Sequence, residues 1–191
     1  HMEVKTQLPT IIGGTAIALG RMVGIDDVHS GRVASMTAAF AAAVFGWLLV
    51  LEVTGSAAAG LVGAAAVFSI YGLFAEASTG FQPKVFMVAF LLAAHFFCAK
   101  RKVLLAGVTG ACAFLCWQPA GLVLASCGLA LLLDRRTSWT SLARFVIGAL
   151  LMFGAYEAWF AWNGALAEQI HQEWRLAFGA PHKEKLLADA V

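Results

Sequence analysis

Residues 114–124 read FLCWQPAGLVL, and this stretch decides how the most apolar part of the chain folds. It lies inside a run from Val103 to Leu133, which has 31 residues and no charged side chain. One helix of that length would be about 46 Å long at ~1.5 Å per residue, too long for a hydrocarbon core of ~30 Å. Pro119 cannot continue a helix, but it suits the first turn of a new one. We therefore predict a helical hairpin with Gln118-Pro119 at its tip, at a membrane face.

The composition of the whole chain is that of a membrane protein. Of its 191 residues, 61% are hydrophobic and 13% are charged, whereas a soluble domain has roughly 45–50% and 25%. The mean hydropathy of +0.81 agrees with this interpretation. The formal net charge is only +2, and no basic run is interleaved with aromatic residues, so we expect no nucleic-acid partner.

Apolar segments predict a single all-α, polytopic membrane domain over residues 1–191, with about six transmembrane helices in a bundle spanning 33–162. The segments are 33–51, 57–75, 81–99, 103–117, 120–133 and 142–162. Residues 8–22 are short and begin near a proline, so we expect an interfacial helix there. Residues 163–191 are expected to form an extracytoplasmic amphipathic segment, because apolar residues recur every four positions at Leu166, Ile170, Trp174 and Phe178. Gly60 with Gly63, and Gly107 with Gly110, should allow close helix packing.

Positive charge orients the predicted bundle. Lys100-Arg101-Lys102 precedes the 103–133 hairpin, and Asp134-Arg135-Arg136 follows it. Both clusters should be cytoplasmic by the positive-inside rule, and two intervening helices place them on the same side. Residues 52–56 are then also cytoplasmic, while 76–84 and Gln118-Pro119 face outside. We predict an integral, multi-pass protein of a bacterial inner membrane.

The four cysteines lie in apolar segments, at positions 98, 112, 116 and 127. Cys112 and Cys116 would share a helix face and could form half of a metal site, but free cysteine usually behaves as a small buried hydrophobe. We predict no disulfide, no metal and no cofactor. His95 lies inside an apolar segment, and we expect a neutral ring bonded to a neighbouring helix, although a polar intramembrane residue can also be functional.

The predicted outer face gathers acids, cations and amides. They are Glu3, Lys5, Gln7, Asp26, Asp27, His29, Arg32, Glu76, Gln82, Lys84, Gln118 and Glu157. Such a set could bind an anionic lipid headgroup together with a polar substrate, although each residue could equally belong to a solvated loop. The middle of each predicted span is almost wholly apolar, which favours interfacial chemistry over the passage of a solute.

Three stretches resemble membrane glycosyltransferases of the GT-C type, such as the protein O-mannosyltransferases and the aminoarabinose transferase of lipid A. In residues 3–35, Glu3, Lys5 and Pro9 match a Glu/Lys-Pro motif, Gly24 matches a glycine, and Arg32 with Ser35 matches the Arg-x-x-Ser that opens a span. Residues 76–97 resemble the segment with an outer acidic residue, here Glu76. Residues 103–124 resemble a hairpin that often carries a lysine near the lipid phosphate, and Gln118 stands in the corresponding place.

The resemblance implies an enzyme that transfers a sugar from a polyprenyl-phosphate donor to an acceptor at the extracytoplasmic face. It implies substrate binding by Glu3, Lys5, Glu76, Lys84 and Gln118, with the two lysines placed for the donor phosphate. The expected partners are the polyprenyl-phosphate-linked sugar and membrane lipids.

The resemblance also implies where the general base lies. The catalytic aspartate of the family precedes the motif at Glu3, so the chain is expected to be an internal fragment without its base. Asp26-Asp27 is an acidic pair, but it lies in a linker where the family has variable polar residues. A transporter or flippase-like carrier and a non-catalytic structural subunit are the alternative functions.

Overall fold

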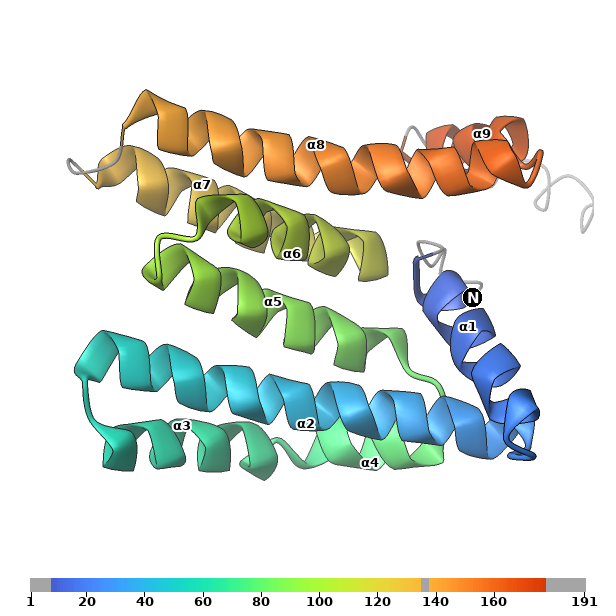
Figure 1. Cartoon of the computed structure of the whole chain (residues 1–191), viewed down its shortest axis with the longest axis horizontal. Coiled ribbons are helices and arrows are strands. Elements are labelled where there is room, and N and C mark those ends of the chain that lie inside the picture. Colours follow the sequence, from blue (N-terminus) through green and yellow to red (C-terminus); the bar gives the residue numbers. More distant parts are fainter. Residues whose placement is uncertain (1–7, 135–137, 178–191) are drawn as a thin grey trace, which may run out of the picture. The chain divides into compact units, whose positions relative to one another are not determined.

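The computed structural model describes residues 8–134 and 138–177, and this part of the chain is helical without a strand (Figure 1). The helices are α1 (Leu8–Met22), α2 (Asp27–Thr54), α3 (Ala57–Ser69), α4 (Tyr71–Thr79), α5 (Pro83–Ala99), α6 (Val103–Cys116), the 3-10 turn η1 (Gln118–Ala120), α7 (Gly121–Leu133), α8 (Trp139–Trp162) and α9 (Leu166–Ala177). The all-α prediction is confirmed.

The described residues fall into two compact units. The larger runs from Leu8 to Phe153 and holds α1 to α7 with the first part of α8. The smaller runs from Gly154 to Ala177 and holds the end of α8 with α9.

Helix length distinguishes the candidate membrane spans among the described residues. α2 has 28 residues and α8 has 24, and both are long and apolar enough to cross a membrane. The apolar helices α5, α6 and α7 are shorter. The prediction of about six crossings therefore stays a prediction, within a fold whose all-helical, apolar character is confirmed.

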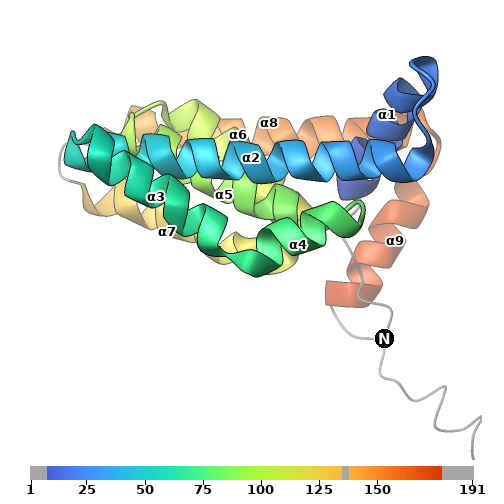
Figure 2. The same ribbon diagram turned by 90° about the horizontal axis from the view of Figure 1, so that it is seen from below.

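The expected single helix over 57–75 is instead two helices. α3 and α4 together pass the test for a span, but they are bent by 57° (Figure 2). The break falls at Ile70, whose ψ of 79° lies outside the helical region. Gly72, a poor helix former, follows two residues later.

The predicted hairpin is confirmed. α6 ends at Cys116, and Trp117 adopts an extended conformation with φ −159° and ψ 119°. Pro119 lies in the first turn of η1, where its missing N–H costs nothing. α7 then lies beside α6 (Figure 1), and a Cβ built at Gly110 would stand 2.7 Å from Leu124 Cδ1.

Two ion pairs bring three connecting segments of the larger unit to one end of it. Lys100 Nζ lies 2.5 Å from Glu52 Oε2, and Arg101 Nη2 lies 2.7 Å from Asp134 Oδ2. We call this end, formed by residues 52–56, 99–103, 134 and 138–141, the paired end. Arg135 and Arg136 lie outside the described residues, but Asp134, which precedes them, contacts the first basic cluster, as Glu52 does. These contacts support the prediction that the two clusters and Glu52 share one side of the bundle.

Glycines allow close helix packing at the expected positions. A Cβ built at Gly107 would lie 2.0 Å from the carbonyl oxygen of Phe145, and one at Gly148 would lie 2.2 Å from that of Leu104. One at Gly63 would lie 3.1 Å from the carbonyl oxygen of Gly46. The backbones of α6 and α8, and of α2 and α3, therefore approach each other where side chains would keep them apart.

The cysteines and His95 are packed in the larger unit. All four cysteines are free, and Cys112, Cys116 and Cys127 are buried, as expected of small hydrophobic side chains. His95 Nδ1 lies 2.9 Å from the carbonyl oxygen of Leu91. This partner is in the same helix, α5, so the expected bond to a neighbouring helix is wrong.

In the smaller unit, α9 begins at Leu166 as the amphipathic pattern predicts, while Phe178 lies outside the described residues. Gln169 stands between the apolar positions of this pattern, which predicts a solvent-facing side chain, but it is buried and its Nε2 donates to Tyr156 Oη at 2.7 Å. The chain turns back at Gly164, whose φ is +69°, and this turn brings α9 against the end of α8.

Candidate functional site

The candidate site lies at the end of the larger unit opposite the paired end. α2 and α5 begin toward this end, and α6 ends toward it (Figure 1). We call this the tip end and define it as residues 20–32, 80–84 and 117–120.

Lys84 and Trp117 meet at the tip end. Lys84 is in the first turn of α5, and its Nζ stands 5.5 Å from the centre of the Trp117 ring. A cation over an indole face gains roughly 0.5–1 kcal/mol at an exposed site. Both side chains are exposed, and the exposed Gln118 follows directly. The structure therefore brings together two of the predicted substrate-binding residues from segments 34 positions apart.

The segment before Lys84 is held by α1 and α2. Ser35 is fully buried, and its Oγ accepts a hydrogen bond from the backbone N–H of Gln82 at 3.0 Å. The ring of Phe81 packs against Gly13, and its Cβ packs against Gly31; a Cβ at either glycine would be 3.3 Å from Phe81. The position of Lys84 is therefore fixed by packing rather than by its own exposed side chain.

Arg32 adds a second cation near this segment, one helical turn before Ser35. Its Nε is buried and has no hydrogen-bond partner among the residues that the structure describes. Leaving such a donor unpaired costs about 1–3 kcal/mol. Arg32 matches the Arg-x-x-Ser motif but is not one of the five predicted substrate-binding residues. A charged residue followed by a long apolar run was the signal that could have identified it.

Asp26 and Asp27 form the corner between α1 and α2. Asp26 caps α2 by accepting from His29 N at 3.0 Å, and the side chain of Arg21 donates to both carboxylate oxygens of Asp27, at 2.8 and 2.6 Å. The bond from His29 N holds the pKa of Asp26 below its usual value, and the Arg21 bond does the same for Asp27. The same pairing raises the pKa of Arg21. Both carboxylates therefore build the corner and are poorly suited to accept a proton.

The remaining predicted ligands lie elsewhere. Glu76 is exposed on α4, and Glu3 and Lys5 lie outside the described residues. Within the described part of the chain, no three His, Cys, Asp or Glu side chains are grouped so that they could hold a metal ion.

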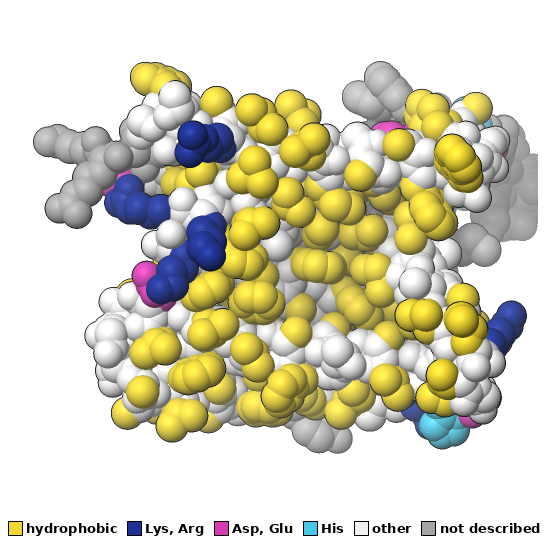
Figure 3. Space-filling view, viewed as in Figure 1, with side chains coloured by type: hydrophobic (Ala, Val, Ile, Leu, Met, Phe, Trp, Pro, Cys, Tyr) yellow, Lys and Arg dark blue, Asp and Glu magenta, His cyan; other side chains and the backbone are white. Residues whose placement is uncertain are grey.

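Two apolar grooves run along α2 from the tip end. The first, of about 430 Å³, lies between α1 and α2, and its lining includes Leu19, Met22, Ile25 and Ala34. The second, of about 370 Å³, lies between α2 and α5, and its lining includes Ala34, Phe45, Phe86 and Phe90. Ala34 lines both, so together they follow more than half of α2. Hydrophobic side chains cover much of the molecular face in Figure 3.

A family model for DolP-mannose mannosyltransferase matches residues 7–154. The chain belongs to this family. The match covers α1 to α7 and most of α8, which is nearly the whole of the larger unit. Comparisons with curated proteins and with solved structures found no match.

The family confirms the resemblance to GT-C glycosyltransferases and identifies the chain as a membrane mannosyltransferase. It indicates dolichyl-phosphate mannose as the donor, which is a polyprenyl-phosphate sugar, as the resemblance implied. With its apolar helices, the chain is an integral membrane protein. Glu76, Lys84 and Gln118 lie inside the matched residues, whereas Glu3 and Lys5 precede them.

Proposed function

We propose that the chain transfers mannose from dolichyl-phosphate mannose to an acceptor at the extracytoplasmic face of a bacterial inner membrane that it crosses several times. The observation that carries this proposal is the Lys84–Trp117 contact at the end opposite the basic loops. The positive-inside rule makes the paired end cytoplasmic, so the tip end is extracytoplasmic.

The donor phosphate is held by Lys84 and Arg32. Lys84 offers a mobile point charge, and Arg32 offers a buried donor that needs an acceptor. Trp117 holds the Lys84 ammonium at the surface until the donor phosphate, an anion, replaces the neutral indole ring as its partner. Gln118 can donate to a phosphate or sugar oxygen. Lys5 and Glu3 act from the segment before α1, Lys5 on the same phosphate.

The dolichyl chain lies in the grooves along α2. Both grooves are almost wholly apolar, as a prenyl chain requires. Since Ala34 lines both grooves and the first one lies beside the tip end, one prenyl chain that follows α2 can pass along both while its phosphate stays at the interface.

The proposed reaction requires the residues at the tip end to bind the donor phosphate and to stabilise its charge. An acceptor hydroxyl oxygen bonds to C1 of mannose, the bond from C1 to the phosphate oxygen breaks, and dolichyl phosphate leaves with the electron pair. Lys84 and Arg32 stabilise the negative charge that grows on the leaving phosphate. The acceptor proton must pass to a carboxylate. Glu3 and Glu76 serve as supporting acids that bind hydroxyl groups, and Asp26 and Asp27 remain committed to the α1–α2 corner.

The test measures equilibrium binding of radiolabelled dolichyl-phosphate mannose to the purified full chain. Lys84→Ala removes a charge-assisted contact worth about 1.5–3 kcal/mol, which is roughly a 10- to 150-fold loss of affinity. Lys84→Arg should retain part of the binding, and Lys84→Glu should abolish it. The same series at Lys5 tests the second lysine.

Lys100→Gln is the matched control, because it removes a partly exposed lysine from the paired end. Donor affinity should stay at the parent value in this variant. If Lys84→Ala and Lys84→Glu both keep donor affinity within about twofold of the parent, the phosphate site is assigned to the wrong residues.

A further inference from the structure

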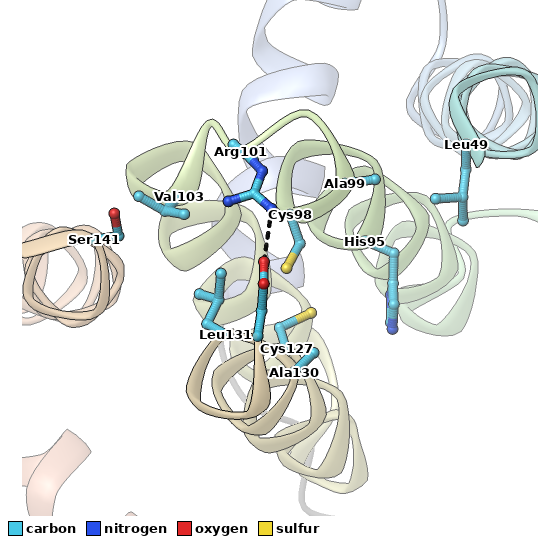
Figure 4. Close-up of a pocket in the computed structure, with 11 residues that line it drawn as sticks. Leu49, His95, Cys98, Ala99, Arg101, Val103, Cys127, Ala130, Leu131 and Ser141 are labelled. Carbon is cyan, nitrogen blue, oxygen red and sulfur yellow. Dashed lines mark hydrogen bonds and ion pairs between the residues drawn. The ribbon is translucent and has the colours of Figure 1, made fainter. Parts of the chain in front are cut away.

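A second cavity lies at the paired end, away from the proposed donor site. It has a volume of about 350 Å³ and lies among α2, α5, α6, α7 and the start of α8. Its polar lining includes Arg101, Asp134 and Ser141, and its apolar lining includes Leu49, Val103 and Leu131 (Figure 4). Apolar walls beneath a charged rim suit an amphiphile rather than a free ion.

The backbone of Arg101 gives an independent reason to regard this cavity as a site. Arg101 has a φ of +57°. It lies in a tight turn in which Arg101 N donates to Cys98 O at 3.0 Å and Lys102 N donates to Phe97 O at 2.9 Å. Glycine is the residue that such a helix-ending turn favours. Arginine occupies this position instead of glycine, and its side chain reaches Asp134 at the cavity, as the dashed line in Figure 4 marks.

The charge around the cavity is positive. The described cations nearby are Lys100, Arg101, Lys102 and Arg144, and the described acids are Glu52 and Asp134. Lys100 and Arg101 are paired with those acids. Lys102 and Arg144 are exposed and form no ion pair within residues 8–134 and 138–177. Lysine and arginine side chains accordingly gather at the left edge of the hydrophobic face in Figure 3.

We infer that this cavity binds an anionic phospholipid of the cytoplasmic leaflet. Its phosphate lies against the Arg101 guanidinium, which it shares with Asp134, and Ser141 offers a hydroxyl donor. Lys102 does not line the cavity, but it is exposed next to Arg101 and adds positive charge beside it. The upper part of one acyl chain packs against Val103 and Leu131. Basic pockets between membrane helices on the cytoplasmic side bind such headgroups by the same chemistry. The inference does not depend on the transferase activity, because it uses none of the tip-end residues.

The experiment counts lipids that the purified full chain retains in native mass spectrometry. The parent should retain dioleoylphosphatidylglycerol at least about tenfold more strongly than zwitterionic dioleoylphosphatidylcholine. Arg101→Gly suits the local backbone, so the fold should persist while this preference falls by about tenfold or more. Ala130→Phe, at an exposed residue that lines the cavity, should exclude the lipid without changing any charge.

Arg21→Gln is the control, since it removes an exposed arginine of an ion pair at the tip end and should leave retention unchanged. Equal retention of the two lipids by the parent would overturn the inference. So would parent-like retention in both Arg101→Gly and Ala130→Phe. Displacement of the lipid by excess inorganic phosphate would make this a free-phosphate site, and displacement by dolichyl phosphate in preference to phosphatidylglycerol would make it a donor site. Either result also overturns it.

Discussion

Substituting Gly107 by alanine tests whether α6 and α8 are in backbone contact. The new Cβ would lie 2.0 Å from Phe145 O and 2.9 Å from Ala149 N, both below the 3.0 Å that real Cβ atoms keep. Both atoms are backbone, so no side-chain rotation relieves the overlap, and the helices must separate by about 1 Å. Overpacking of this kind typically costs about 1–3 kcal/mol, which exceeds the ~1 kcal/mol that alanine gains over glycine in a helix.

Gly128→Ala is the matched control for this prediction. It has the same gain in helix propensity, but its Cβ would meet only Phe145 Cε1, at an ordinary 3.6 Å. Thermal unfolding of the detergent-purified chain, followed by tryptophan fluorescence, should show a lower midpoint for Gly107→Ala and an equal or higher one for Gly128→Ala. Midpoints that rise equally in both variants would refute the close approach of the two helices.

Three further predictions concern other parts of the larger unit. Ser35→Ala leaves the Gln82 N–H without its acceptor and should destabilise the fold by about 1–3 kcal/mol, whereas Thr37→Ala, whose exposed hydroxyl bonds within its own helix, should change little in the same unfolding assay. The Arg21 bond lowers the folded-state pKa of Asp27, so its stabilisation is present above the usual value of 3.8 and is lost as the pH falls through the lowered pKa. Unfolding midpoints should therefore drop more on acidification in the parent than in Asp27→Asn. With the four native cysteines replaced, a cysteine at Gln118 should react with an impermeant maleimide added outside cells and one at Lys102 should not; external labelling at Lys102 would reverse the proposed orientation.

Local sequence features predicted much of the helical arrangement. The run from Val103 to Leu133 is too long for one span, which predicts a hairpin, and Pro119 inside the run predicts where the hairpin turns. Gly107 marked a close packing position because small residues have few other uses in apolar helices. The two basic clusters indicated a common end, which the ion pairs now support.

The features that escaped prediction depend on contacts between distant segments. No proline marks the break at Ile70, and the flanking Ser69 and Gly72 are small residues that also occur inside membrane helices. Gln169 looks like a surface residue until Tyr156 supplies its partner across the turn at Gly164. The Lys84–Trp117 contact needs α5 and α6 to be aligned, and Arg32 becomes a buried donor only because α2 already begins at Asp27. In each case the residue is visible in the sequence, but the distant residue that contacts it cannot be inferred from the sequence.

The two ion pairs at the paired end also have a consequence for membrane insertion. Glu52 is synthesised before Lys100, so Lys100 already has its acidic partner when it emerges from the ribosome. Arg101 emerges 33 residues before Asp134, so in the proposed topology its charge is uncompensated while the 103–133 hairpin enters the bilayer. In that topology the charge is available to retain the α5–α6 loop in the cytoplasm, since orientation depends on lysine and arginine near the ends of spans. Once Asp134 has been synthesised, the same guanidinium pairs with it and links the start of α6 to the end of α7. A charge that first directs orientation then stabilises the folded hairpin.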